Sequence, residues 1–360
     1  MAEKVLKKGN EVIALGAIDC GCDGYFGYPI TPQSEVMETL MEEKPWETTG
    51  MVVLQAESEI ASINMVYGGA CCGKKVMTSS SSPGMSLMCE GISYLAGAEL
   101  PCLLVNVVRG GPGLGTIQPS QGDYFQAVKG GGHGDYKVIV LAPFSAQEMY
   151  DFVFLGFDLA FKYRTPAMIL SDGMIGQMME KVELRPQQPR LSDDEVAKRY
   201  GSWATIGKPT SRNENVITSL ALDARVHEAL NHRLQAKYKI IEENEVRFET
   251  LQCEDAEYIL VAYGSMARIC ESTVELARAQ GIKLGLLRPI TLYPFPVKEI
   301  ERMVPQLKGI MSVELSTGQM VEDIRLTVNG KIPVTFYGRV GGMIPTPAEV
   351  FTAFKTNYNQ

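Results

Sequence analysis

Short, mostly apolar runs alternate with helical patterns along much of this chain, and that alternation constrains the fold more than any other feature. In the first half, five such runs lie at 51–54, 75–78, 103–108, 138–141 and 167–170. Strands of this kind, separated by helices, are typical of a parallel sheet buried on both faces. We therefore predict an α/β fold in which helices cover both faces of a parallel sheet.

The pattern changes after residue 183, where prolines and charged residues predict a connecting segment. A polar helix of about 28 residues at 221–248 then follows, because apolar side chains recur at helical spacing. Those side chains are Val226, Leu230, Leu234, Tyr238 and Ile241. Because this apolar stripe is too narrow for a core helix, we expect the helix to bridge domains or subunits.

Alternation of strand and helix patterns resumes near the C-terminus, with apolar runs at 258–262, 283–287, 309–313 and 331–336. A chain of 360 residues is long enough for two domains with separate cores. We predict a first domain at 1–190, a linker with the bridging helix at 191–252, and a smaller α/β domain at 253–360.

Charge and composition exclude several classes of function. The net charge of −8 and the absence of a basic stripe argue against a nucleic-acid partner. No run approaches the roughly 20 apolar residues of a membrane span, and the N-terminus lacks the apolar core of a signal peptide. We expect a cytoplasmic protein.

The eight cysteines form one C-x-C, one adjacent pair and four scattered positions. Iron–sulfur and structural zinc sites show repeated C-x₂-C or C-x₂₋₄-C units, which are missing here. Buried, reduced thiols are the better interpretation, and we predict no metal site in this chain. Any iron–sulfur cluster would belong to another polypeptide.

Two glutamates, Glu57 and Glu59, directly follow the apolar run 51–54 and open a helical pattern. One interpretation is that they favour the positive end of the new helix. The other is a functional carboxylate at the carboxyl end of a parallel strand, where ligands bind in such sheets.

Three more segments carry candidate groups at expected strand ends. Thr31 lies between two prolines, which aim its hydroxyl from a stiff loop unless it simply caps the next helix. The serine run TSSSSPG at 78–84 suits an anion or polar ring, or equally a helix N-terminus. Arg109 ends a very apolar strand, so its guanidinium either binds an anion such as a carboxylate or forms a structural salt bridge.

The glycine-rich stretch 110–115 after Arg109 does not match the G-x-G-x-x-G dinucleotide fingerprint. Pro112 lies inside the stretch, so a helix is not expected to begin there. A nicotinamide-dependent oxidoreductase therefore remains only a competing hypothesis. A non-catalytic assembly protein is a third one.

Five ordered segments together resemble the alpha subunit of the 2-oxoacid:ferredoxin oxidoreductases. They are GYPITP at 27–32, QAESE at 55–59, TSSSSPG at 78–84, RGGP at 109–112 and GHGDY at 132–136. The resemblance continues through GS at 264–265 and LRP at 287–289 to GRVGG at 338–342, and so covers nearly the whole chain.

The resemblance implies a thiamine-diphosphate pyrimidine-binding domain followed by a domain like the transketolase C-terminal domain. Glu59, nine positions before Gly68, matches the glutamate that meets N1′ of the aminopyrimidine, with Glu57 as the competing candidate. Arg109 and Thr31 would bind the substrate carboxylate and keto oxygen. The resemblance further implies cofactor contacts from Pro29, Ile30, Ser81 and Ser82. His133 is a weaker candidate for a proton shuttle.

The resemblance also implies partners. The family holds the diphosphate and Mg²⁺ with a Gly-Asp-Gly segment and a later Asn, whereas this chain has only Ser171-Asp172-Gly173. A beta subunit would then supply the Mg²⁺ half of the site and an iron–sulfur cluster. Gamma and ferredoxin-like subunits are expected as well.

The expected reaction is oxidative decarboxylation of a 2-oxoacid to acyl-CoA and CO₂, with coenzyme A as acyl acceptor and ferredoxin as electron acceptor. Related 2-oxoglutarate subunits tend to have Ser-Thr-Gly where this chain has Gly113-Leu114-Gly115. That departure favours a branched-chain substrate, 3-methyl-2-oxobutanoate, with 2-oxoglutarate as the alternative.

Overall fold

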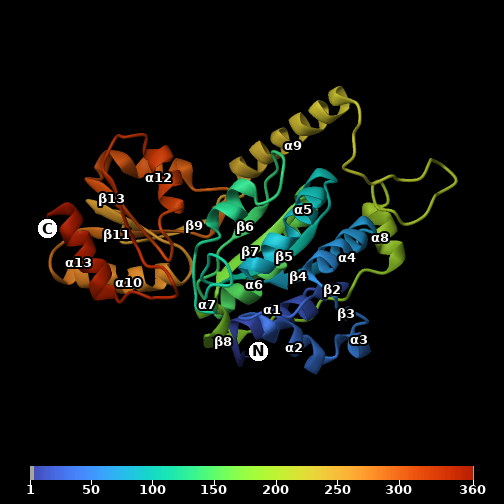
Figure 1. Cartoon of the computed structure of the whole chain (residues 1–360), viewed down its shortest axis with the longest axis horizontal. Coiled ribbons are helices and arrows are strands. Elements are labelled where there is room, and N and C mark those ends of the chain that lie inside the picture. Colours follow the sequence, from blue (N-terminus) through green and yellow to red (C-terminus); the bar gives the residue numbers. More distant parts are fainter. Residues whose placement is uncertain (1–3, 360) are drawn as a thin grey trace.

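The computed structural model describes residues 4–359 and contains two main sheets that lie side by side (Figure 1). The larger, seven-stranded sheet has the order β12-β6-β7-β5-β4-β2-β3. Its strands in that order are Thr291–Tyr293, Ile139–Leu141, Pro166–Asp172, Cys102–Val108, Val76–Ser80, Gly24–Gly27 and Val52–Gln55. All pairs in it are parallel except β12 with β6. The predicted α/β class is confirmed.

Helices cover both faces of this sheet. On one face α4 and α5 pack against each other and on β2, β4 and β5, while α1, α2 and α6 pack together on the other. The helices up to residue 200 are α1 Gly9–Asp19, α2 Ser34–Glu43, α3 Pro45–Thr48, α4 Glu59–Cys71, α5 Ser82–Gly97, α6 Ala146–Tyr163, α7 Gly173–Gln177 and α8 Asp193–Tyr200. A π-helical turn occupies Gln126–Gly130, and β1 (Lys4–Lys8) pairs with β8 (Met179–Glu183).

The second sheet has the order β14-β13-β10-β11-β9, with β9 antiparallel to β11. Its strands are Val334–Gly338, Gly309–Glu314, Tyr258–Val261, Leu284–Pro289 and Phe248–Leu251. The remaining helices are α9 Ala224–Asn244, α10 Gly264–Ala279, α11 Val297–Met303, α12 Met320–Val328 and α13 Pro347–Tyr358, with a 3₁₀ turn at Val304–Gln306. We call residues 245–359 the C-terminal part.

Every apolar run named above as a strand is a strand in the structure, and the long polar helix is α9. It buries Leu234, Tyr238 and Ile241, whereas Val226 of the predicted stripe is exposed. Two strands of the large sheet were not predicted: β2, which is rich in glycine, and the short β12. β12 comes from the C-terminal part of the sequence but lies in the first sheet, so no single point in the chain separates the two sheets. The domain boundaries stay a prediction.

Arg288 on β11 ties the two sheets together. Its side chain is 3% exposed and donates to both carboxylate oxygens of Glu148 on α6, at 2.8 Å each. It also bonds Glu249 on β9 at 2.7 Å and lies over the ring of Phe144. A buried guanidinium held by two carboxylates and an aromatic face fixes the relative position of the sheets.

We expect Arg288→Met to lower the free energy of unfolding by about 3 kcal/mol, because Glu148 would keep a largely buried charge without its partner. Urea denaturation followed by circular dichroism measures this. The control is Lys208→Met, which removes a pair with Glu214 whose two side chains are both solvent-exposed, and it should change stability little. Equal effects of the two substitutions would contradict a structural role for Arg288.

Candidate active site

The candidate residues come together at the carboxyl ends of four neighbouring parallel strands. Thr31 follows β2, Glu59 follows β3, Ser81 and Ser82 follow β4, and Arg109 follows β5. Ligands of open α/β sheets bind at this edge.

Glu59 is the first residue of α4 and is only 7% exposed. Within residues 4–359 nothing forms a hydrogen bond or an ion pair with its carboxylate. Glu57 is exposed and accepts only from the adjacent Ser58 hydroxyl. Burial therefore separates two glutamates that the sequence left as competitors.

Gly84 in the first turn of α5 makes room for the Glu59 carboxylate. A Cβ added to Gly84 would lie 2.7 Å from Glu59 Oε1 and 2.1 Å from Ser80 Oγ. The hydroxyls of Ser80 and Ser81 are buried and also lack a partner. An acceptor and two hydroxyls without partners, beside a glycine, suit a polar ring supplied from outside the chain.

Ser82 joins the start of α5 to the end of β5. Its main-chain N–H donates to Asn106 Oδ1 at 3.1 Å, and its hydroxyl contacts the main-chain N and O of Arg109. Asn106 in turn donates to Asp123 at 2.9 Å. Burial raises the pKa of Asp123, against the opposing effect of its hydrogen bonds with Ser82 and Asn106.

Arg109 and Thr31 are in direct contact, but through the Thr31 carbonyl. Arg109 Nη1 donates to Thr31 O at 3.0 Å and Nη2 donates to Leu114 O at 3.3 Å, while Nε is buried without a partner. The guanidinium has five N–H groups, so donors remain for a carboxylate. The Thr31 side chain is exposed at the same place.

The loop that carries Thr31 is held from three sides. Asn10 and Gln177 donate to the carbonyl of Pro32, at 2.6 and 3.1 Å, and Gln33 accepts from the buried Ser79 hydroxyl. Pro29 is exposed and Ile30 is half-buried on this loop. A rigid backbone here fixes where the Thr31 side chain can reach.

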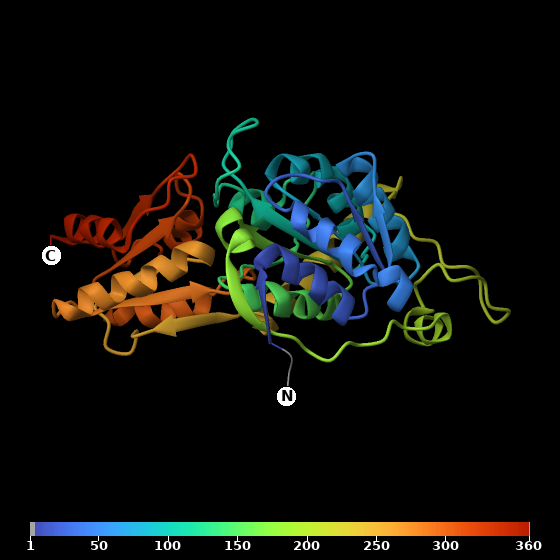
Figure 2. The ribbon, with the colours of Figure 1, turned by 90° about the horizontal axis from the view of Figure 1, so that it is seen from below.

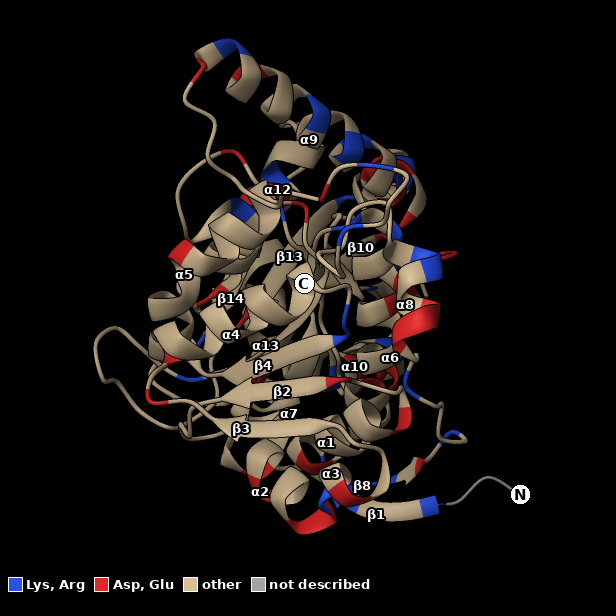
Figure 3. Ribbon diagram, turned by 90° about the vertical axis from the view of Figure 1, so that its right-hand side faces the viewer, with Lys and Arg blue, Asp and Glu red and all other residues tan. Residues whose placement is uncertain are grey.

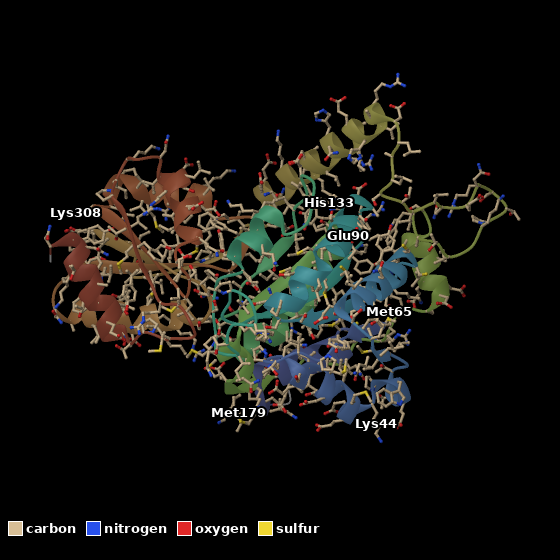
Figure 4. All side chains as sticks on the ribbon, in the orientation of Figure 1. Lys44, Met65, Glu90, His133, Met179 and Lys308 are labelled. Atoms are coloured by element: carbon tan, nitrogen blue, oxygen red, sulfur yellow. The ribbon has the colours of Figure 1, made fainter. Side chains whose placement is uncertain are left out.

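His133 does not join this group. Ser93 on α5 donates to its carbonyl and Tyr94 packs edge-on against its ring at 5.9 Å. Ser93 lies eleven residues beyond Ser82, roughly 16 Å along the helix. Figure 4 shows His133 beside α9, where Gln235 donates to the carbonyl of nearby Asp135.

The glycine-rich loop after Arg109 has no helix behind it, and the next helical turn begins only at Gln126. It projects beside the C-terminal part (Figure 2). This geometry contradicts a dinucleotide fingerprint, as the sequence predicted.

Burial raises the pKa of Cys20 to about 12 and of Cys71 to about 11, so these groups are thiols. No three His, Cys, Asp or Glu side chains between residues 4 and 359 are grouped as metal ligands. None of the helices there combines the length and apolar character needed to cross a bilayer.

Sequence reasoning named Ser80 and Gly84 only as members of the run 78–84, and it missed Asn106 and Asp123. Asn106 carried a usable signal, since it is the one polar residue in the run 103–108 and is 1% exposed. Asp123 gave none, because its role arises from neighbours on other elements.

Comparison with known proteins places these residues in a family. Residues 15–245 match the family described as pyruvate flavodoxin/ferredoxin oxidoreductase, thiamine diphosphate-binding, and residues 256–350 match pyruvate:ferredoxin oxidoreductase core domain II. The chain is 50% identical to ketoisovalerate oxidoreductase subunit VorB of Methanothermobacter marburgensis, covering 93% of this chain and 92% of that one. It is 36% identical to 2-oxoglutarate synthase subunit KorA of Methanocaldococcus jannaschii, covering 95% and 97%.

Among solved structures, 2-oxoglutarate:ferredoxin oxidoreductase from Magnetococcus marinus superimposes with a TM-score of 0.85 at 28% identity. The match covers 99% of this chain but only 65% of that longer one. A split-gene transketolase shares the fold, with a TM-score of 0.57 and 13% identity. The resemblance seen in the sequence is confirmed, and the chain belongs to the pyruvate flavodoxin/ferredoxin oxidoreductase family, with a thiamine diphosphate-binding first part.

Proposed function

We propose that this chain is one subunit of a thiamine diphosphate-dependent 2-oxoacid:ferredoxin oxidoreductase that acts on 3-methyl-2-oxobutanoate. The products would be the acyl-CoA and CO₂, with the electrons passing to ferredoxin one at a time. The observation that carries this proposal is the buried Glu59 carboxylate, which has no partner among the residues that the structure describes and lies beside Gly84.

Glu59 fits the aminopyrimidine end of thiamine diphosphate. Its carboxyl group would share a proton with N1′, and the unpartnered hydroxyls of Ser80 and Ser81 offer further polar contacts. Pro29, Ile30 and Ser82 border the same space in the proposal. Once bound, the cofactor supplies the carbanion chemistry that releases the carboxylate as CO₂.

Arg109 would hold the substrate carboxylate. Its buried Nε has no partner and lies on the same edge of the guanidinium as Nη2, which suits a carboxylate with two oxygens. The Thr31 hydroxyl would bond the carboxylate or the keto oxygen, because Arg109 already contacts its carbonyl. These two residues orient the substrate while Glu59 serves the cofactor.

The diphosphate, the Mg²⁺ and the iron–sulfur cluster are proposed to come from a beta subunit. Asp172, in the nearest sequence to a Gly-Asp-Gly segment, is 2% exposed and caps α7 by accepting from Met174 and Ile175. Burial raises the pKa of Asp172, which further disfavours it as a Mg²⁺ ligand. We propose gamma and ferredoxin-like subunits as additional partners.

The surface around Glu59 suits such a partner. Large apolar side chains there are exposed on β3, α4 and α5: Val52, Leu54, Ile60, Met65, Leu87 and Tyr94. The edge strand β3 carries no charged residue (Figure 3), and Met65 is labelled on α4 in Figure 4. An apolar face beside a half-complete site is where a second subunit would bind.

The branched-chain substrate is favoured over 2-oxoglutarate by two observations. The ketoisovalerate relative is more similar than the 2-oxoglutarate relative, at 50% against 36% identity. The loop after Arg109 also presents apolar Leu114 and Ile117, whereas a second carboxylate would need a cation or hydroxyl.

The test is the complex purified from its native host, assayed with 2-oxoacids, coenzyme A and a viologen dye. We expect kcat/KM for 3-methyl-2-oxobutanoate to exceed that for 2-oxoglutarate by at least about 100-fold. Preference for 2-oxoglutarate would favour the alternative, and no dye reduction with any 2-oxoacid would refute the proposal.

Glu59→Ala should reduce dye reduction by the assembled complex at least about 100-fold, because N1′ would lose the carboxyl group with which it shares a proton. Size-exclusion chromatography should show unchanged assembly. The matched control is the exposed neighbour Glu57→Ala, with activity close to wild type. If Glu57→Ala were inactive and Glu59→Ala active, the roles would be reversed; two active variants would point to a non-catalytic subunit.

Gly84→Ala should raise the thiamine diphosphate concentration for half-maximal activity by about tenfold, because the new methyl group overpacks against Glu59 and Ser80. Gly68→Ala on α4 is the control, since its Cβ would meet nothing within 4 Å. A cofactor requirement unchanged in Gly84→Ala would place the pyrimidine ring elsewhere.

A further inference from the structure

Gln121 is a buried side chain at the junction between the first sheet and the C-terminal part, and both polar atoms of its amide are hydrogen-bonded. It is 2% exposed. Its main-chain N–H donates to Leu315 O at 2.8 Å, and its Oε1 accepts from Leu315 N at 2.9 Å. Its Nε2 donates to Tyr263 O at 2.9 Å, and the Tyr263 hydroxyl donates to its carbonyl at 3.4 Å. Gln121 thus uses both main-chain and side-chain groups to bind two backbone sites of the C-terminal part.

Leu315 is itself held rigidly by the residue before it. Glu314 is fully buried, and its carboxylate joins the end of β13 to the start of α12. The donors to it are the hydroxyls of Ser312 and Ser316 and the main-chain N–H groups of Gln319, Met320 and Val321. The backbone that Gln121 binds is therefore a fixed reference point in the C-terminal part.

Gln121 lies two residues from the strand-like contact that holds Arg109. Pro119 forms an isolated antiparallel bridge with Arg109, and Gly110 N donates to Gln118 O at 3.0 Å. Between them, Ser120 Oγ donates to Leu315 O at 3.3 Å. The main chain at Arg109 is thus connected to the C-terminal part through residues 118–121, which form hydrogen bonds with both.

The loop after β14 makes a second close contact with the same segment. Gly342, in the loop after β14, has φ +84°, and a Cβ there would lie 2.2 Å from Gln118 Cβ. This loop is the GRVGG segment at 338–342 that the sequence analysis singled out. Only a glycine lets it approach Gln118 so closely.

We propose that Gln121 is a positioning residue, through which the C-terminal part sets the place of the Arg109 guanidinium beside Thr31. The inference rests on the proposed role of Arg109 as the carboxylate clamp. The C-terminal part then contributes to substrate binding without touching the substrate.

The test is a double-mutant cycle in the assembled complex, with Gln121→Ala, Arg109→Ala and the combined variant. We expect Gln121→Ala to raise KM for 3-methyl-2-oxobutanoate by about tenfold while kcat changes less than about twofold. KM for coenzyme A should stay unchanged. In the Arg109→Ala background the Gln121 substitution should add no further loss of kcat/KM, because both act through one guanidinium.

Arg288→Met is the matched control, because it weakens the same junction through Glu148 on α6 and Glu249 on β9, and removes no contact of residues 118–121. It should lower the Tm while leaving KM for the 2-oxoacid unchanged. Independent effects of Gln121 and Arg109 in the cycle, or an equal rise of KM in Arg288→Met, would overturn the inference. If Arg109→Ala left KM unchanged, the proposed role of Arg109 in binding the substrate carboxylate would be refuted. The cycle therefore distinguishes refutation of the Arg109 role from refutation of the Gln121 role alone.

Discussion

The largely buried Glu59 carboxylate, without a partner among residues 4–359, is the constraint on which this molecule depends. Removing such a group from water is costly unless a partner is supplied. The first turn of α4 offsets part of that cost, because a helix N-terminus favours a negative charge by about 1 kcal/mol. In the proposal, the rest comes from a group that enters the space beside Gly84. The fold thus holds a carboxyl group for which residues 4–359 supply no partner.

The two halves of the proposed site are held in place by different parts of the chain. Glu59 and the serines of β4 depend on α4 and α5, which pack on the first sheet. Arg109 depends on contacts that run through Gln121 to the C-terminal part, nearly 200 residues further along the chain. Placing the cofactor group and the substrate group on separate supports lets the substrate end change without disturbing the pyrimidine end. The relatives named for ketoisovalerate and for 2-oxoglutarate are consistent with such independence.

How far the sequence predicts this structure depends on how local each signal is. The buried strands were predicted because continuous apolar runs need both faces covered. Glu57 and Glu59 became candidates because they follow such a run, and the family resemblance favoured Glu59. β2 was missed because its sequence, GYFG, has two glycines and no apolar run, and β12 because it has three residues. Gln121 carried no signal, since its partners Tyr263 and Leu315 become neighbours only in the folded chain. The ordered motifs indicated the family, but not that Arg109 contacts Thr31 through its carbonyl.

The exposed apolar face beside Glu59 follows from the same constraint. If the chain enclosed the cofactor alone, α4 would need a polar outer surface, yet Ile60 and Met65 are exposed there. Exposed apolar side chains such as these, beside an incomplete site, indicate a surface that a partner covers. The burial of that face and the supply of a donor to Glu59 would therefore occur in one step, when the second subunit binds. Coupling the two events would keep the Glu59 carboxylate from meeting the cofactor before water is excluded from the site. Its electrostatic interactions are strongest once water is excluded.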